Sequence, residues 1–587
     1  MKLNETLEKQ LKKEPNYVTD IGELKKWVVI NKAKNYDAEL IGLLLDDKEL
    51  KVKFFIDVKG VLVFNQSFFI QFLEQKNYLN DSYTAYKNKV GLTIDGKFLK
   101  QRNEVALVWP FKDCVLEGGQ SREEDKREEI FFNETLAQDE ITQLLEPKVL
   151  TNAKRYTSKG EKPLDKFNRN KNGIITDNLI IKGNNLLGLH SLKEEFYGQV
   201  KLIYIDPPYN TGNDGFNYND RFNQSTWLTF MKNRLEVARQ ILSEDGAIYV
   251  NLDFNQVHFA KVLMDEIFGN ENFQREIIWR IGWLSGYKTI DKNFIRNHDS
   301  ILFYSKNNKN LNFIKKYINN ESFKPLVKYE KIKDKLTELG LNRQQQIDLL
   351  NFINHINRPE KYPIEDVWNG NEYDDLNSIA IVSFSGETVS KMLGTPELKG
   401  QKSEKLIQRI IEAHTNENDI VLDYHLGTGT TAAVANKMKR QFIGVEQMDY
   451  IETIAVERLK KVIEGEQSGI SKAVNWTGGG EFVYFELKKS NQNFIEQVES
   501  AKDTKTVLKI WEEMKTKSFL NYNVDLQKQE AHIEEFKALT LEEQKQHLVE
   551  LLDKNQLYVN LSSLNDKDFI VSSDEKKVTE DFYQIKK

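Results

Sequence analysis

Short apolar runs alternate with amphipathic stretches in two parts of the chain, and this alternation predicts its strands and helices. Residues 200–205 and 247–252 are almost continuously apolar, which is the pattern of strands buried on both faces. Between them, residues 227–242 carry apolar side chains three and four positions apart, which predicts a helix. A strand, a helix and a strand at this spacing are typical of a parallel α/β sheet.

The same rhythm returns further along the chain, between residues 401 and 465. It predicts a helix at 403–413, a strand at 420–423, a turn of small residues at 427–431, a helix at 432–438 and a strand at 442–446. Residues 307–379 lie between the two blocks, lack this rhythm and are rich in Lys, Asn and Gln. We therefore interpret them as an inserted module.

The chain of 587 residues is too long for one compact domain, because domains usually have about 100–200 residues. We expect an α/β core that is split into two halves, with further parts between and around them. The expected parts are an N-terminal domain at 1–165, the first half of the core at 166–306, the inserted module at 307–379, the second half of the core at 380–475, and a mostly helical, charged C-terminal domain at 476–587.

Composition limits the class of protein. Hydrophobic residues make up 40% and charged residues 29%, the balance of a soluble globular protein. The 83 Lys and Arg against 89 Asp and Glu give a net charge of −6, which excludes a basic coat over the whole surface but not a local basic face. The single cysteine, Cys114, excludes intramolecular disulfides, and we interpret it as a buried structural residue. No apolar run approaches the roughly 18 residues that span a membrane, so we expect a soluble, intracellular protein.

A first candidate site directly follows the strand at 200–205. Asp206-Pro207-Pro208-Tyr209 stands at the carboxyl end of this strand, the edge where open parallel sheets bind ligands. Because two prolines fix the backbone, the Asp206 carboxylate and the Pro207 carbonyl could each accept one N–H of an amine while Tyr209 stacks on its ring. The segment therefore predicts a grip on a planar base with an exocyclic NH2, although an ordinary turn would also explain it.

A second candidate site follows the strand at 420–423. Gly427 and Gly429 let the backbone approach a ligand closely, and the helix that starts there favours an anionic group. Glu446 ends the next strand, where an acid would hydrogen-bond ribose hydroxyls. Because Gly427 and Gly429 with Ala432 also satisfy the dinucleotide fingerprint, NAD competes as a ligand, and a structural turn stays open too. A Walker A loop is excluded, since no Gly-Lys-Ser/Thr follows.

Together the two sites are more specific than either, since one would hold an adenosine-bearing cofactor and the other a planar amine at one sheet edge. In this combination the sequence resembles an N6-adenine DNA methyltransferase of the permuted β class, in which the Asp-Pro-Pro-Tyr motif precedes the glycine motif. More closely, it resembles the Mod subunit of type III restriction–modification systems. The resemblance runs from about residue 100 to 490, and further stretches that carry it are 108–114, 181–187, 227–235, 252–253 with 265–269, and 401–407.

The resemblance implies a Rossmann-like α/β methyltransferase with permuted motif order, a target-recognition module at 307–379, and α+β or α extensions at the two ends. S-adenosylmethionine would donate the methyl group, and the transfer would need no metal. The residues implied for its pocket are Asp423, His425, Gly427, Gly429, Thr430, Thr431, Glu446 and Lys402, and those implied for catalysis on a flipped adenine are Asp206, Pro207, Pro208 and Tyr209. His425 stands where the wider class usually has Phe.

The resemblance also implies partners: double-stranded DNA, a second copy of the chain and a separate helicase–endonuclease (Res) subunit, in the bacterial cytoplasm and away from membranes. No nuclease or helicase motif is evident in the sequence, so another chain would supply cleavage. Two alternatives stay open, a solitary regulatory methyltransferase and a DNA-binding specificity subunit whose catalytic site has decayed.

DNA contact is expected around the inserted module. Residues 275–335 hold fourteen Lys or Arg against six Asp or Glu, with aromatic residues such as Trp279 and Tyr304 between them. Such a surface could bind phosphates, although a solvated Lys-rich face above a core of aromatics fits equally well. The candidate readers of base edges are Arg343, Gln344, Gln345 and Gln346.

Overall fold

The structure is a computed structural model, and its described residues fall into two compact units, 1–106 and 107–587. Cys114 and the stretch 108–114 lie outside the described residues. Those described are 3–18, 24–74, 93–94, 97–98, 143–210, 224–280, 294, 296–374, 376, 389–394, 401–521 and 524–585. Over these ranges, no helix is both long and apolar enough to cross a membrane.

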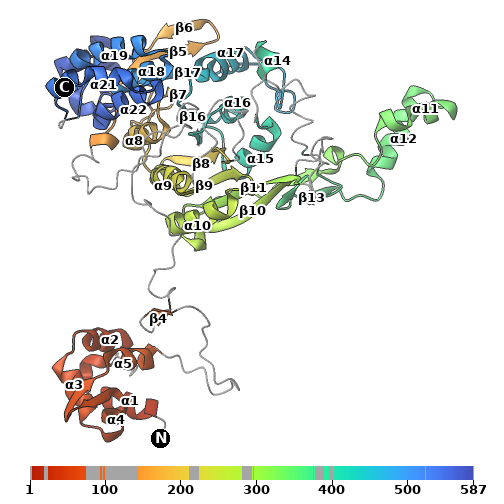
Figure 1. The fold of residues 1–587 in the computed structure, drawn as a ribbon. Coiled ribbons are helices and arrows are strands. Elements are labelled where there is room, and N and C mark those ends of the chain that lie inside the picture. Colours follow the sequence, from red (N-terminus) through yellow and green to blue (C-terminus); the bar gives the residue numbers. More distant parts are fainter. Residues whose placement is uncertain are drawn as a thin grey trace. The chain divides into compact units, whose positions relative to one another are not determined.

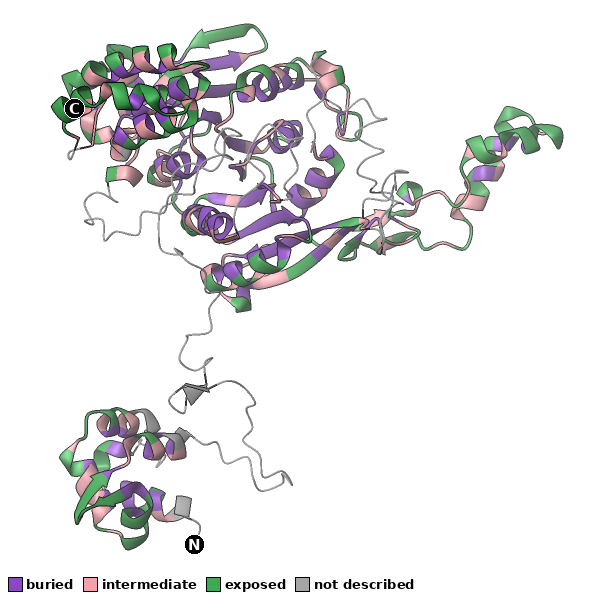
Figure 2. Ribbon diagram, viewed as in Figure 1, coloured by how far each residue is buried: buried purple, intermediate pink, exposed green. Residues whose placement is uncertain are grey.

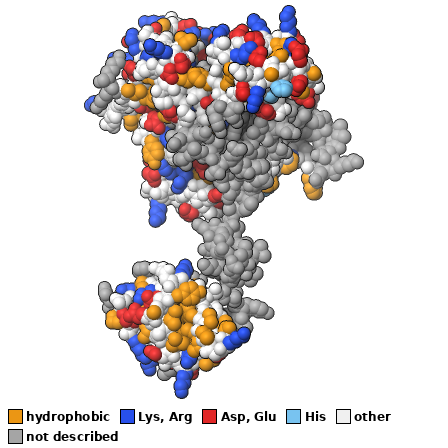
Figure 3. All heavy atoms as spheres, turned by 60° about the vertical axis from the view of Figure 1, so that its left-hand side comes forward, with side chains coloured by type: hydrophobic (Ala, Val, Ile, Leu, Met, Phe, Trp, Pro, Cys, Tyr) orange, Lys and Arg blue, Asp and Glu red, His pale blue; other side chains and the backbone are white. Residues whose placement is uncertain are grey.

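The N-terminal unit packs short helices against a hairpin of β1 (Phe55–Val58) and β2 (Val61–Phe64). Phe55 and Phe64 face its core, while the other face of the hairpin leaves apolar side chains exposed; Figure 3 shows hydrophobic side chains on the surface of this unit. The remaining elements are α1 (Leu3–Leu11), a 3-10 turn (Pro15–Tyr17), α2 (Lys26–Lys34), α3 (Ala38–Leu45), α4 (Lys48–Phe54), α5 (Gln66–Glu74), β3 (Thr93–Ile94) and β4 (Lys97–Phe98).

The larger unit is built on one mixed sheet, in which the described strands number eleven and follow the order β14-β10-β11-β9-β8-β15-β16-β7-β17-β5-β6. Its middle, from β9 through β8, β15, β16 and β7 to β17, is parallel. The strands are β5 (Leu150–Thr157), β6 (Gly160–Pro163), β7 (Asn178–Lys182), β8 (Val200–Ile205), β9 (Leu242–Leu252), β10 (Phe273–Arg280), β11 (His298–Ser305), β14 (Val367–Trp368), β15 (Ile420–Asp423), β16 (Gln441–Glu446) and β17 (Phe482–Leu487).

Helices cover both faces of this sheet (Figure 1). Successive residues of β8 point to opposite faces, with Ile203 in the core beneath one set of helices and Leu202 in the core beneath the other. The first set is α8 (Asn185–Phe196), α9 (Gln224–Ile241) and α10 (Val257–Phe268); the second is α15 (Glu404–His414), α16 (Thr430–Lys437), a π-helical turn (Ile451–Val456) and α17 (Glu457–Ile463). Figure 2 shows the sheet buried between them, so the expected Rossmann-like α/β fold is confirmed.

The inserted module and the C-terminal part add smaller elements. The module contains β12 (Tyr317–Asn319), a 3-10 turn (Asn320–Ser322), α11 (Tyr329–Glu338), α12 (Arg343–His355) and β13 (Lys361–Pro363). Elsewhere are α14 (Val389–Leu393), α18 (Asn491–Ser500), α19 (Thr504–Lys517), α20 (Leu526–Ala531), α21 (Ile533–Ala538), α22 (Leu541–Leu551), α23 (Ser573–Phe582) and 3-10 turns at Asn270–Asn272, Lys554–Gln556, Leu561–Ser563 and Lys567–Phe569.

The ends of the central sheet differ from the boundaries expected at residues 165 and 476. Strands β5 and β6 fall in the expected N-terminal domain, and β17 falls in the expected C-terminal domain. In the structure, β17 pairs with both β7 and β5, so strands from both expected domains complete the same sheet. Pairing between segments more than 300 residues apart leaves no trace in local periodicity, which is why the sequence did not indicate it.

Candidate active site

The two predicted sites lie side by side at one edge of the sheet. Strands β8 and β15 are parallel neighbours, with Leu202 opposite Val421 and Ile203 opposite Leu422. Asp206 follows β8 and Asp423 ends β15, so both segments leave the sheet at its carboxyl edge. The expectation that a permuted chain order still brings the sites together is confirmed by this pairing.

Asp206 is the centre of a hydrogen-bonded group. The Tyr209 hydroxyl donates to Asp206 Oδ1 at 2.7 Å, and Asn251 Nδ2 donates to the same oxygen at 3.2 Å and also to the Tyr209 hydroxyl. Lys402 Nζ donates to Asp206 Oδ2 at 2.5 Å. Burial raises the pKa of Tyr209 well above its ordinary value, and the Asp206 charge adds to this shift, so the phenol is a neutral donor.

The two proline carbonyls have different surroundings. Pro208 O accepts a hydrogen bond from Trp227 Nε1 at 2.8 Å, and Trp227 is completely buried in α9. Pro207 O accepts no hydrogen bond from any residue that the structure describes. The turn is therefore anchored at the Pro208 carbonyl, while the Pro207 carbonyl, which the sequence predicted as an acceptor, can still accept a hydrogen bond.

Lys402 belongs to both sites, although the sequence placed it in the donor pocket alone. Its ammonium pairs with Asp206 and lies 5.3 Å from the centroid of the Tyr209 ring. Its backbone carbonyl accepts from Thr430 Oγ1 at 3.5 Å, at the start of α16. The segment before α15 thus joins the Asp206 group to the glycine turn.

Asp423 is buried beneath the glycine turn. Its Oδ1 accepts from the His425 backbone N–H at 3.0 Å, and its Oδ2 accepts from Thr431 Oγ1 at 2.6 Å. Burial raises the pKa of Asp423 to about 7; these two hydrogen bonds oppose the shift, and the charges of Asp206 and Glu446 add to it. Asp423 therefore holds both ends of the turn in place.

The glycine turn and Glu446 define the other side of this site. Gly429 adopts φ +76° and precedes α16, and a Cβ there would lie 3.4 Å from the Ala455 side chain. The Glu446 carboxylate accepts three backbone N–H groups, from Gly427 at 3.0 Å, Gln447 at 2.9 Å and Met448 at 3.1 Å. Its position is therefore fixed at the end of β16, although burial raises its pKa.

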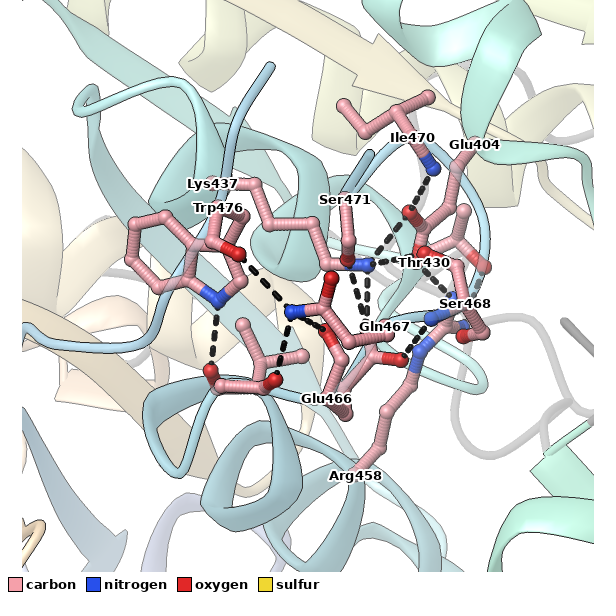
Figure 4. Close-up of polar contacts among 12 residues, drawn as sticks. Glu404, Thr430, Lys437, Arg458, Glu466, Gln467, Ser468, Ile470, Ser471 and Trp476 are labelled. Atoms are coloured by element: carbon pink, nitrogen blue, oxygen red, sulfur yellow. Dashed lines mark hydrogen bonds and ion pairs between the residues drawn. The ribbon is translucent and has the colours of Figure 1, made fainter. Parts of the chain in front are cut away.

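A buried cluster of four charges lies behind the glycine turn (Figure 4). Arg458 Nη1 donates to Thr430 Oγ1 at 2.7 Å, and its Nη2 donates to Glu404 Oε1 at 2.9 Å. Lys437 donates to Glu404 Oε2 at 2.7 Å and pairs with Glu466. Two cations thus meet two carboxylates in a site where Glu404, Lys437 and Arg458 have no exposed side-chain surface. The cluster ties the glycine turn to the start of α15.

Sequence reasoning missed Asn251, Trp227 and this charge cluster. Asn251 interrupts an apolar strand at its carboxyl end, and Glu404, Lys437 and Arg458 stand on helices that are otherwise apolar toward the sheet. A polar residue inside an apolar pattern was the available signal, because burying it requires a specific partner.

The candidate DNA readers are only partly placed at the surface. Gln346 is buried, and its side chain accepts from the Tyr329 hydroxyl at 2.8 Å, so it belongs to the core of the module and the expectation for it is wrong. Gln345 forms the capping box of α12 with Asn342, while Arg343 is exposed. In the basic segment, Trp279 and Tyr304 are buried, as the core interpretation of the aromatics expected, whereas Phe313 and Tyr317 are exposed. No three His, Cys, Asp or Glu within the described ranges form a group able to hold a metal ion.

Comparison with known proteins identifies the class. Residues 200–457, which contain both sites, match a family model described as a DNA methylase, and residues 37–92 match one described as the methylation subunit of type III restriction/modification enzymes. The fold and the paired sites are thus those of a DNA methyltransferase, and NAD is set aside as the ligand of the glycine turn.

A relative that matches almost the whole chain identifies the particular family. The chain is 38% identical to the probable HindVI Mod subunit of Haemophilus influenzae, covering 96% of both chains. The chain belongs to the Mod subunits of type III restriction–modification enzymes, the adenine-specific DNA methyltransferases of these systems. A second relative, the EcoP15I Mod subunit of Escherichia coli, is 34% identical over 24% of this chain and 26% of its own. A solved structure, the M1.HpyAVI–SAM complex, is 17% identical over 48% of this chain and 99% of its own, with a TM-score of 0.29.

Proposed function

We propose that the segment from Asp206 to Tyr209 holds a flipped adenine of double-stranded DNA, and that the glycine turn holds S-adenosylmethionine, whose methyl group is transferred to N6. The observation that carries this proposal is the Asp206 group itself. At the edge of the sheet, the Asp206 carboxylate and the Pro207 carbonyl, which accepts no hydrogen bond from the described residues, stand beside the Tyr209 ring and next to strand β15, which leads into the glycine turn.

The contacts around the glycine turn support the binding of an adenosine with an amino-acid tail. Glu446, fixed by three N–H groups, presents a carboxylate where ribose hydroxyls would donate, and Gly429 keeps the turn free of side-chain bulk. S-adenosylmethionine supplies an electrophilic methyl group when it is bound. Asp423 supports the turn from below through His425 and Thr431.

The residues after β8 would orient the amine. Asp206 Oδ1 accepts one amine N–H in place of the Tyr209 hydroxyl, and the Pro207 carbonyl accepts the other, which draws the nitrogen lone pair toward the methyl group. As the N–C bond forms and the S–C bond breaks, the surplus amine proton passes toward Asp206 and solvent. Lys402 keeps the carboxylate oriented through Oδ2, and flipping costs a few kcal/mol that stacking on Tyr209 offsets.

We further propose that the chain works as a dimer on DNA together with a separate helicase–endonuclease chain. Support for the partner chains comes from its membership of the Mod family, and the exposed Arg343 in the inserted module supports contact with DNA. The decayed alternative is not favoured, because the Asp206 group is complete, and the solitary alternative is not favoured, because the chain resembles a type III Mod subunit over 96% of its length.

The test is transfer of a labelled methyl group from S-adenosylmethionine to duplex DNA, read by modification-sensitive sequencing. We expect N6-methyladenine at one short motif, and Asp206→Ala should lower the rate by at least about 100-fold with donor affinity unchanged. Asp265→Ala is the matched control, because Asp265 also pairs with a half-buried Lys, Lys261, but on α10. Near wild-type transfer by Asp206→Ala would refute the role of the segment.

A further inference from the structure

Arg234 is a buried cation with unused donors. It lies on α9 with 4% of its surface exposed, and its guanidinium stacks 3.6 Å from the centroid of the Phe230 ring. Its Nε donates to Asn185 Oδ1 at 2.6 Å and its Nη1 to the Phe230 carbonyl at 2.9 Å. Nη2 makes no hydrogen bond with the residues that the structure describes, and none of their carboxylates pairs with this side chain.

Buried cations elsewhere in this unit meet carboxylates or several amide oxygens: Lys148, for example, donates to the Leu144 carbonyl at 2.9 Å and to Asn560 Oδ1. Arg155 pairs with Asp177 at 2.6 Å, and Arg458 pairs with Glu404. Burying a charge without a counter-charge is costly, since the charge loses its water and gains no ion pair. Burial lowers the pKa of Arg234 only to about 9, so the guanidinium still carries its charge at neutral pH. Among the residues that the structure describes, Arg234 therefore has no anionic partner.

His425, beside Arg234, also has an unused polar atom. Asn185 connects the two, because its Oδ1 accepts from Arg234 while its Nδ2 donates to the Tyr424 carbonyl at 3.1 Å and lies 3.4 Å from His425 Nδ1. A donor facing Nδ1 makes Nδ1 the acceptor, so the ring proton sits on Nε2. His425 Nε2 is buried and has no hydrogen-bond partner among the described residues. The Nε2–H group can therefore donate a hydrogen bond to a ligand.

The position of these side chains restricts the anion. His425 stands two residues after Asp423 and donates its backbone N–H to that carboxylate, so the group stands at the donor site, on the α8 and α9 side of the sheet. At 4% exposure, Arg234 presents almost no surface to a DNA backbone outside the protein, whereas Asn185 and His425 connect it to the donor site. A planar carboxylate matches the guanidinium fork, and the amino-acid tail of the donor carries one.

We infer that Arg234 and His425 bind the carboxylate of the methionine portion of S-adenosylmethionine. Arg234 supplies charge and Nη2–H, and His425 supplies Nε2–H, while Asn185 fixes both side chains. This inference rests on the proposed function of the glycine turn, and it assigns Arg234 and Asn185 to donor binding.

The test compares S-adenosylmethionine with decarboxylated S-adenosylmethionine, which has the same adenosine and sulfonium but no carboxylate. With the full-length chain in calorimetry, we expect the decarboxylated compound to bind roughly 10- to 100-fold more weakly. In Arg234→Met this preference should shrink to a few-fold, whereas Arg234→Lys should keep part of it. Arg239→Met, an exposed Arg on the same helix, is the matched control and should keep all of it.

The outcomes separate this inference from the proposed function. Equal binding of both compounds by the wild-type chain would overturn the carboxylate assignment while leaving the donor site intact. A full preference retained in Arg234→Met would overturn the role of Arg234. Should that variant fail to fold by circular dichroism, the wild-type comparison and Arg234→Lys still decide. Binding of neither compound by the wild-type chain would overturn the donor site itself, and this inference with it.

Discussion

Replacing Arg458 by Met would leave the Glu404 carboxylate buried with only Lys437 as its counter-charge. Arg458 makes three connections at once: an ion pair with Glu404 at 2.9 Å, a hydrogen bond to Thr430 Oγ1 at 2.7 Å and one to the Thr428 carbonyl at 3.3 Å. Neither Arg458 nor Glu404 has exposed side-chain surface. The replacement therefore removes a cation without admitting water in its place.

Removing one partner of a buried pair costs about 3–5 kcal/mol, because the remaining charge stays desolvated. An exposed ion pair of the same unit sets the scale: Lys439 pairs with Glu417 at 3.5 Å with side chains 70% and 60% exposed. Breaking a pair of that kind costs about 0–1 kcal/mol. Arg458→Met and Lys439→Met each remove one cation, so their net charges match while their burial differs.

Urea denaturation followed by circular dichroism measures the difference. With a urea dependence of about 2–3 kcal/mol per M, we expect the midpoint of Arg458→Met to fall by roughly 1–2 M, and that of Lys439→Met by a few tenths of a molar unit at most. Because Thr430 loses its hydrogen bond, affinity for S-adenosylmethionine should also fall in Arg458→Met alone. Equal midpoints for the two variants would refute the reasoning that burial sets the cost.

Two further predictions concern the donor site. Gly429→Val should abolish S-adenosylmethionine binding in calorimetry, since φ is +76° and the new side chain meets Ala455. The control is Gly198→Val, which has a similar φ of +66° in open space and should keep the affinity. Equal losses of affinity in the two variants would contradict the donor site. Burial raises the pKa of Asp423 to about 7, so the folded state keeps a proton that the unfolded state releases at lower pH. The contribution of Asp423 to the free energy of unfolding therefore falls as the pH rises toward 7. The denaturation midpoint of wild type relative to Asp423→Asn should therefore fall between pH 5 and pH 8, and a constant difference would count against the buried acid.

Local pattern was sufficient for the elements that carry the chemistry. A short apolar run that stops at Asp-Pro-Pro is typical of a buried strand followed by a rigid turn, and β8 ends at Ile205, directly before Asp206. The small residues after Asp423 likewise predicted a turn into a helix, and α16 begins at Thr430. Both features depend on neighbours within a few positions, which the sequence contains in full.

Tertiary structure decided which distant side chains share a site. Asn251 and Lys402 reach Asp206 only because β9 lies beside β8 and the segment before α15 lies across the same edge. The same applies to Gln346, which α11 covers through Tyr329, so a residue in a polar run became part of a core.

The sequence by itself determined the residue types of the two motifs, their order and the α/β class, because each follows from local conformation and residue type. The tertiary structure alone decided the full width of the sheet, the pairing of Arg458 with Glu404, and the absence of such a carboxylate partner for Arg234 among the described residues. Whether a charge is paired depends on contacts made across the fold and on the water that these contacts exclude. The amino-acid sequence gives the charge of each side chain but not its neighbours in space.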